Sequence, residues 1–176
     1  MGHTAPIRKF KSSGVTLIEL MIGIAILSIL LALALPNYGI WIQNTQIRTA
    51  AESVLSGLQM ARVEAARRNA NVEFTLGAGT AWNVTVAATG DMIQQRTSDG
   101  STTATAVAAG GTKLTFNGLG RVVANADGSG SLNQVDLDSS ILSPSDSREL
   151  RITIETGGII RMCDPQVVAA GDPRKC

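Results

Sequence analysis

A single apolar run near the N-terminus constrains this chain more than any other feature. The run covers residues 15–35 and contains one charged residue, Glu19. As a helix rising about 1.5 Å per residue, it would match the roughly 30 Å hydrocarbon core of a bilayer. A carboxylate inside that core is costly, so an acidic residue there indicates a function and needs a partner. The run therefore predicts a membrane-spanning helix over residues 15–36.

Charge is distributed unevenly around this run. Of the 15 Lys and Arg residues and 14 Asp and Glu residues, Arg8, Lys9 and Lys11 precede the run and no acidic residue does. By the positive-inside rule, this cluster places the N-terminus in the cytoplasm and the rest of the chain outside. The part from Val15 onward carries a formal charge of −2, which argues against nucleic-acid binding driven by net charge.

Residues 1–14 are short, basic and polar and contain no hydrophobic region of their own. They are therefore interpreted as a leader that is removed by processing. An ordinary secretory signal is the alternative, because Ala32-Leu33-Ala34 resembles a signal cleavage site. That alternative gives Glu19 no purpose, and the apolar run is longer than the usual signal core.

A second, amphipathic half of the helix is predicted over residues 37–69. Pro36 favours a kink rather than an end of the helix. Arg67 and Arg68 followed by Asn69 are typical of a helix C-terminus. Apolar residues recur at three- and four-residue spacing and form a stripe on one face: Ile47, Ala51, Val54, Leu55, Leu58, Ala61 and Ala65. One helix over 16–69 is expected, and its second half needs a surface on which to pack.

The remaining residues, 70–176, are predicted to form a β-rich head. Apolar and polar residues alternate in segments typical of half-buried strands: 72–76, 82–87, 92–97, 113–116, 121–124, 150–154 and 159–163. Asn117-Gly118 and Gly157-Gly158 supply turns for two hairpins, and residues 99–112 and 125–133 are predicted as loops. The fold class is therefore α+β, with a long N-terminal helix packed against a β-rich head.

Enzymatic chemistry has little support. The one histidine, His3, lies in the predicted leader, and the sequence contains no nucleophile elbow, phosphate loop or metal-ligand spacing. Asp136, Asp138 and Asp146 could gather around a cation such as Ca²⁺, but a solvated polar loop is the favoured interpretation. We predict no catalytic residue, no metal site and no cofactor.

Two further groups of residues leave alternatives open. Tyr38 and Trp41 follow the apolar run directly, either as anchors at the membrane interface or as residues packed on the head. Cys163 and Cys176 form a disulfide if the head is exported, and remain free thiols if it is not. No histidine lies near them, which disfavours a metal site.

Basic residues gather around the C-terminal hairpin and tail. They are candidate DNA-binding residues, because a basic patch can contact a phosphate backbone: Arg148, Arg151, Arg161, Arg174 and Lys175. The alternative is a set of ordinary surface charges, since neighbouring acidic residues nearly cancel them: Asp146, Glu149, Glu155, Asp164 and Asp172.

The string Gly14-Val15-Thr16-Leu17-Ile18-Glu19-Leu20-Met21, followed by the apolar run to Pro36, resembles the N-terminus of type IV pilins and type II secretion pseudopilins. The resemblance implies that a prepilin peptidase cuts between Gly14 and Val15 and methylates the new amine. It also implies that Glu19 meets the N-terminal amine of a neighbouring subunit in a filament core. The implied partners are the prepilin peptidase, the inner membrane, and other major and minor pilins or pseudopilins.

Three further stretches, residues 59–65, 116–122 and 161–176, are similar to the minor-pilin branch called FimT, FimU or GspH. The similarity implies a β-rich head on the second half of the helix and a role near the pilus tip, in priming assembly. The alternatives are an H-type pseudopilin of a type II secretion system and a minor pilin that binds DNA. Some FimT-type members are associated with DNA uptake through a basic Gly-Arg-x-Arg element in the C-terminal region. The corresponding residues 157–161 keep a glycine and one arginine, Arg161, and lack the first arginine.

Overall fold

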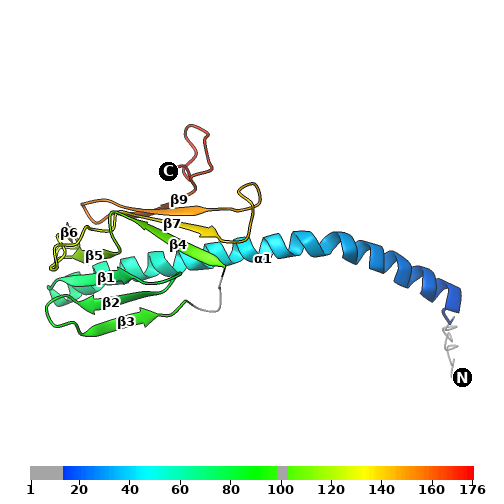
Figure 1. Cartoon of the computed structure of the whole chain (residues 1–176), viewed down its shortest axis with the longest axis horizontal. Helices are drawn as coiled ribbons and strands as arrows, with labels where there is room; N and C mark the ends of the chain where they lie inside the picture. Colours follow the sequence, from blue (N-terminus) through cyan, green and yellow to red (C-terminus); the bar gives the residue numbers. More distant parts are fainter. Residues whose placement is uncertain (1–13, 99–102) are drawn as a thin grey trace, which may run out of the picture. The chain divides into compact units, whose positions relative to one another are not determined.

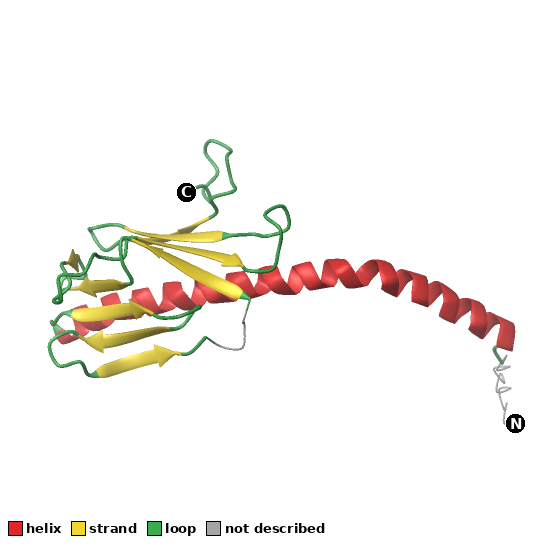
Figure 2. Cartoon of the chain, in the orientation of Figure 1, coloured by secondary structure: helices red, strands yellow, loops and turns green. Residues whose placement is uncertain are grey.

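The computed structural model describes residues 14–98 and 103–176, without the side chains of residues 33–36. The predicted leader up to residue 13, part of the predicted loop 99–112 and the predicted kink at Pro36 lie outside this description. The described chain contains one helix and nine strands (Figures 1 and 2). Their bounds are α1 Leu17–Arg68, β1 Val72–Leu76, β2 Trp82–Val86, β3 Met92–Arg96, β4 Ala104–Ala109, β5 Lys113–Phe116, β6 Val122–Val123, β7 Gln134–Ser139, β8 Leu150–Ile154 and β9 Ile160–Cys163.

The chain divides into two compact units, Met1–Tyr38 and Gly39–Cys176. In the first unit the large apolar side chains from Val15 to Leu31 are 52–78% exposed, and none of them belongs to the buried core. Within the described residues, no single helix is long and apolar enough to cross a membrane, whereas Leu17–Ala32 and Asn37–Arg68 taken together have the length and composition for it.

In the second unit, α1 buries the apolar stripe expected from its sequence. Six members of the stripe have no exposed surface: Ile47, Ala51, Val54, Leu58, Ala61 and Ala65. The helix ends at a Schellman motif, in which the Ala70 N–H donates to the Ala65 carbonyl at 3.2 Å and the Asn69 N–H to the Ala66 carbonyl at 3.3 Å. Asn69 has φ 49°, a left-handed conformation that asparagine tolerates well. The predicted end of the helix is confirmed.

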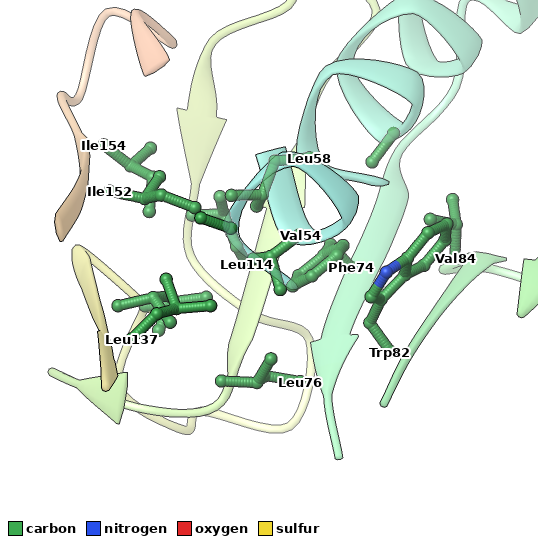
Figure 3. Close-up of a cluster of buried hydrophobic side chains, with 14 of the residues drawn as sticks. Val54, Leu58, Phe74, Leu76, Trp82, Val84, Leu114, Leu137, Ile152 and Ile154 are labelled. Carbon is green, nitrogen blue, oxygen red and sulfur yellow. The ribbon is translucent and has the colours of Figure 1, made fainter. Parts of the chain in front are cut away.

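The strands form two antiparallel sheets. One has the order β3-β2-β1-β5-β6 and the other the order β4-β7-β8-β9. Figure 3 shows Val54 and Leu58 of α1 among side chains of both sheets, including Phe74, Leu114 and Ile152. The helix and the two sheets therefore share one hydrophobic core, and the predicted α+β architecture is confirmed.

Two strands correct the sequence-based expectations. β4 lies within the segment predicted as loop 99–112, and β7 places Asp136 and Asp138 on a strand instead of in a polar loop. The inward residues of β4 are alanines, whose small side chains give a weak apolar signal. Those of β7 are Val135 and Leu137, both fully buried, and they alternate with aspartates, which strands normally disfavour.

The turn of the hairpin between β5 and β6 also differs from the prediction. The Asn117 N–H donates to the Arg121 carbonyl at 2.9 Å, so the connection is longer than the two residues Asn117-Gly118. The positive φ of 71° falls at Gly120. By contrast, the hairpin of β8 and β9 turns at Gly158, where φ is 83°, as expected.

Candidate functional site

The first candidate site is the start of α1, where Thr16 and Glu19 form a capping box. The Thr16 N–H and Oγ1 donate to Glu19 Oε2 at 2.8 and 2.7 Å, and the Glu19 N–H donates to Thr16 Oγ1 at 3.3 Å. This reciprocal arrangement satisfies amide donors that helix geometry leaves without partners. Glu19 Oε1 makes no hydrogen bond with any described residue, so half of the carboxylate stays available to another group.

The peptide bond between Gly14 and Val15 lies just before this cap. Residues 14–16 are not helical, Val15 is 76% exposed, and a Cβ built on Gly14 would meet no atom within 4 Å. The predicted cleavage bond is therefore accessible and outside the helix. The structure thus places Gly14, Val15 and Glu19 within one short exposed segment.

The second candidate site is a groove of about 590 Å³ in the second unit. One wall is the face of α1 that carries Trp41, Thr45 and Arg48, at positions i, i+4 and i+7. The facing residues come from the start of β8, the end of β9 and the C-terminal tail: Arg148, Leu150, Met162, Cys163, Asp164, Pro173 and Arg174.

Asn44, which also lines the groove, fixes the loop before β8 to the helix. Its Nδ2 donates to the Asp146 carbonyl at 2.9 Å, and its Oδ1 accepts from the Arg148 N–H at 2.7 Å. The two bonds hold the backbone of Arg148 beside α1. The Arg148 side chain is exposed, and its guanidinium makes no ion pair with a described residue.

A disulfide fixes the tail on the other side of the groove. It joins Cys163 to Cys176 with a Cα–Cα distance of 5.0 Å and a sequence separation of 13, so the disulfide alternative is the one present. Within the closed loop, the Asp164 N–H donates to the Arg174 carbonyl at 2.7 Å. These links fix the positions of Pro173 and Arg174, which line the groove.

The five candidate cations are engaged in different ways. Arg148 and Arg174 share the groove, whereas Arg151 lies on β8 and donates to Asp136 at 2.6 Å. The Arg161 Nη2 donates to the Lys175 carbonyl at 2.5 Å, and the Lys175 Nζ donates to the Val168 carbonyl at 3.3 Å.

Two of the arginines that line the groove are neutralised locally. Arg48 pairs with Glu52 at 3.0 Å and Arg174 pairs with Asp172 at 2.8 Å. Hydrogen bonds from the side chain and backbone of Arg174 lower the pKa of Asp172 to about 2. Within the described part of the chain, Arg148 is therefore the groove arginine without an ion pair, and the carboxylate of Asp164 lines the same groove.

The three aspartates considered for a cation are engaged separately. Asp136 binds Arg151, Asp138 accepts from the Ser147 hydroxyl, and Asp146 accepts from Ser143 Oγ at 2.7 Å. Among residues 14–98 and 103–176, no group of three or more His, Cys, Asp or Glu residues could hold a metal ion.

Sequence reasoning missed the groove because its walls come from three distant segments. Arg48 belongs by sequence to the polar face of the helix, and nothing local shows that Asn44 binds a loop about a hundred residues away. A sequence signal for the groove was the seven-residue spacing of Trp41 and Arg48, which places both on one face of the helix.

Comparisons with known proteins agree with this fold and this N-terminus. The family profile described as "Prokaryotic N-terminal methylation motif" matches residues 9–35, and the profile described as "Type II transport protein GspH" matches residues 50–158. No curated protein sequence matches the chain significantly.

Two solved structures of the type IV minor pilin FimU from Pseudomonas aeruginosa (strain PAO1) are similar to the chain. The first, in space group P21, has a TM-score of 0.52 and 19% identity, and covers 73% of this chain and 99% of that one. The second, in space group P65, has a TM-score of 0.47 and 22% identity, and covers 69% and 99%. The first shares the pilin-like fold of a long helix packed against antiparallel sheets.

The GspH match extends over more than half of the chain, and the methylation motif precedes it in the order typical of pilins. Proteins of this kind are structural and not enzymatic. The chain therefore belongs to the GspH family, within the type IV pilin and pseudopilin superfamily.

Proposed function

We propose that the chain is a minor type IV pilin that takes part in pilus initiation and lies near the pilus tip. The N-methylation motif implies processing by a prepilin peptidase and assembly with other pilins. The hydrophobic N-terminal helix is consistent with inner-membrane anchoring before assembly. The observation that supports the proposal is the exposed Gly14–Val15 bond directly before a capped helix whose large apolar side chains up to Leu31 are more than half exposed.

In this proposal, cleavage creates an α-amine on Val15, and Glu19 binds the corresponding amine of a neighbouring subunit. Thr16 occupies Glu19 Oε2 within the subunit, so Oε1 is the oxygen that faces the neighbour. The attraction between opposite charges grows as the dielectric constant falls. An unpaired carboxylate in a filament core would be penalised instead, so the pairing would favour one register between subunits.

Two substitutions separate the two tasks of Glu19. Glu19→Gln keeps the capping box, which accepts Gln as well as Glu, but removes the charge. Glu19→Ala removes both. We expect both variants to be lost from sheared pili while they remain in the membrane fraction. Incorporation of Glu19→Gln at the level of the wild type would refute the proposed charge pairing. Mass spectrometry of the mature N-terminus should show methylated Val15.

An H-type pseudopilin of a type II secretion system is the second candidate, and the GspH match favours it. The physical role of the N-terminal helix is the same in both machines. Deletion of the chain in its host, scored for surface pili and for secreted enzymes, separates them. Loss of secretion with normal piliation would assign the chain to the secretion system.

A further inference from the structure

We propose that a surface formed by Arg62, Leu119, Arg121 and Ile159 docks a segment of a neighbouring pilin or pseudopilin subunit that carries both carboxylates and apolar side chains. These four residues are called the turn surface below. The inference rests on the proposed assembly of the chain with other subunits. It goes beyond that proposal because the proposed assembly contact is made by the N-terminal helix, whereas this one is made by the second unit.

Three elements meet at the turn surface, namely α1 and the turns of two hairpins. The turn between β5 and β6 carries Gly120, and the turn between β8 and β9 carries Gly158. Both glycines are buried, and a Cβ on Gly158 would overlap the Gly120 carbonyl oxygen. The Val122 N–H donates to the Thr156 carbonyl at 3.2 Å. The two turns are therefore tied to each other, although they belong to different sheets.

Arg62 of α1 packs against both turns. A Cβ on Gly120 would come within 3.1 Å of Arg62 Nε, and a Cβ on Gly158 within 3.5 Å of the same atom. Arg62 is nevertheless exposed and makes no hydrogen bond or ion pair with a described residue. Packing thus restricts this side chain while its donors stay open. A guanidinium held in this way loses less entropy when it binds an anionic group.

Arg121 places a second guanidinium beside the first. It follows Gly120 directly, so the two Cα atoms are about 3.8 Å apart. Asn117 fixes the backbone of this turn, because its Oδ1 accepts from the N–H groups of Leu119 and Arg121, both at 3.0 Å. The Arg121 side chain is exposed and makes no ion pair with a described residue. Both arginines therefore lie within one small area whose backbone is already ordered.

Two exposed apolar side chains lie next to the arginines. Leu119 directly precedes Gly120 and is 81% exposed, and Ile159 directly follows Gly158 and is 55% exposed. Arginine together with apolar residues is typical of protein interfaces. A carboxylate can accept two parallel hydrogen bonds from a guanidinium, and apolar side chains of the same segment would cover the leucine and the isoleucine.

The charges around the turn surface favour an acidic partner. Asp91 lies in the turn between β2 and β3, three strand positions from β6, and accepts from Thr89 Oγ1 at 2.7 Å. Glu64 pairs with two arginines of α1, and Glu155 is exposed in the turn between β8 and β9. Four arginines and two glutamates then leave an excess of two positive charges in the two turns and at the end of α1: Arg62, Glu64, Arg67, Arg68, Arg121 and Glu155.

A different protein subunit fits the turn surface better than DNA or a second copy of this chain. DNA binding relies on several cations along a phosphate backbone, to which Leu119 and Ile159 offer nothing and which Glu155 would repel. Two copies related by a twofold axis through this surface would bring the arginines of both copies together, and like charges disfavour such a contact. A segment with carboxylates from another subunit meets both the charge and the apolar area.

The test replaces Leu119 of the full chain, in its host, with the photoreactive residue p-benzoylphenylalanine, and mass spectrometry maps what it captures. We expect a pilin or pseudopilin subunit, captured through a segment that contains Asp or Glu. Arg62→Glu combined with Arg121→Glu should reduce the yield by about tenfold, which corresponds to about 1.4 kcal/mol. The same probe at Val107, which is 64% exposed on β4, should not capture this segment. Arg148→Glu is the matched control and should leave the yield unchanged, because Arg148 is exposed and unpaired but lines the groove.

A charge swap separates docking from a structural role of Arg62. Arg121→Glu alone should weaken capture by several-fold with an unchanged urea midpoint, because its exposed side chain makes no ion pair with a described residue. Replacing the captured Asp or Glu of the partner by Arg should restore the yield with Arg62→Glu and Arg121→Glu. A loss of packing around Arg62 would not be rescued in this way.

Several outcomes would overturn the proposal. They are capture of a second copy of this chain or of lipid instead of another subunit, capture through a segment without carboxylates, a yield that ignores Arg62 and Arg121, and tight binding of a short DNA duplex through these two arginines. Capture of a pseudopilin, with normal piliation after deletion of the chain, would support the docking surface and refute the role in the pilus. Normal incorporation of Glu19→Gln would refute the charge pairing alone, because cross-linking from Leu119 is measured with Glu19 in place.

Discussion

Gly57 lies on α1 against the aromatic pair of Phe74 and Trp82, whose ring centroids are 6.0 Å apart. A Cβ at this position would come within 2.8 Å of Trp82 Cδ2 and 2.9 Å of Phe74 Cε2. The Trp82 Nε1–H donates to Ser53 Oγ at 3.0 Å, which restricts how far its ring can move. The glycine is therefore explained by packing, although helix propensity alone would favour alanine.

This competition predicts the sign of a substitution. Alanine in a helix interior gains about 1 kcal/mol over glycine, and overpacking a core costs about 1–3 kcal/mol. We expect Gly57→Ala to lower the free energy of unfolding by about 1 kcal/mol, measured by urea titration. Gly39→Ala is the matched control, because a Cβ on Gly39 would meet no atom within 4 Å, and it should be neutral or stabilising. A stabilising Gly57→Ala would contradict the packing argument.

Glu64 gives the stability of the helix end a pH dependence. Hydrogen bonds from Arg67 and then Arg68, at 2.7 and 2.8 Å, lower the pKa of Glu64 from 4.5 to about 2. Because the pKa is lower in the folded state, the carboxylate stabilises that state above pH 4.5, and this contribution is lost as the pH falls from 4.5 to 2. Glu64→Gln should therefore be less stable than the wild type at pH 5 and 7.

The measurement is the urea midpoint of both proteins at a series of pH values from 7 to 2. We expect the difference between them to shrink below pH 4.5 and to vanish near pH 2. A difference that stays constant over this range would show that the ion pairs of Glu64 contribute nothing. As a control at pH 7, Glu52→Gln removes one exposed pair with Arg48 and should cost less than about 1 kcal/mol.

At the scale of elements, the kind of residue at the buried positions determined which parts of the fold could be predicted from the sequence. The helix stripe and the β8–β9 hairpin carry large apolar residues at regular spacing, and both are present as expected. β4 and β7 were missed because alanines in one and aspartates in the other hide the alternation. Asp136 is tolerated on β7 because Arg151 on the paired strand β8 neutralises it, a cross-strand relation that needs the register.

The two candidate sites differ in the same way. The segment around Gly14 and Glu19 is local in sequence, so its residues could be predicted from the sequence alone. The groove depends on contacts between residues more than a hundred positions apart, such as Asn44 with Arg148. Periodicity and composition carry no information on such contacts.

The C-terminal tail depends on one covalent link for its order. Closing a loop of this length is worth about 3 kcal/mol in the chain-entropy model, and the tail has few buried residues of its own. We expect Cys176→Ser to lower the free energy of unfolding by up to about 3 kcal/mol. Hydrogen exchange should show that the Asp164 amide, which donates to the Arg174 carbonyl, loses protection.

The amide of Ile152 on β8 serves as the internal reference for this measurement. Ile152 is fully buried and pairs with Met162 in the sheet, so its protection should fall only by the global loss of stability. Unchanged protection of Asp164 in Cys176→Ser would show that hydrogen bonds alone order the tail.

At the scale of the whole molecule, the two units differ in how much of their apolar surface is exposed to solvent. The buried core begins at Ile47 and continues to Cys163, whereas the apolar residues of the first unit are more than half exposed. The exposed area of the first unit needs a bilayer or neighbouring helices to cover it. The part of α1 in the second unit thus packs into the core, whereas the part in the first unit keeps its apolar side chains exposed for a bilayer or for neighbouring helices.

This division predicts that the second unit folds alone. A fragment of residues 39–176 lacks none of the buried core residues, so its loss of stability should not exceed the fraying of the first helical turns. We expect a cooperative urea transition with a midpoint close to that of the full chain in detergent, and a disulfide between Cys163 and Cys176. Leu58→Ala in the same fragment is the positive control, since truncation of a fully buried leucine costs about 2–5 kcal/mol. A fragment that binds hydrophobic dyes or unfolds without a cooperative transition would show that the head needs the apolar helix for its own fold.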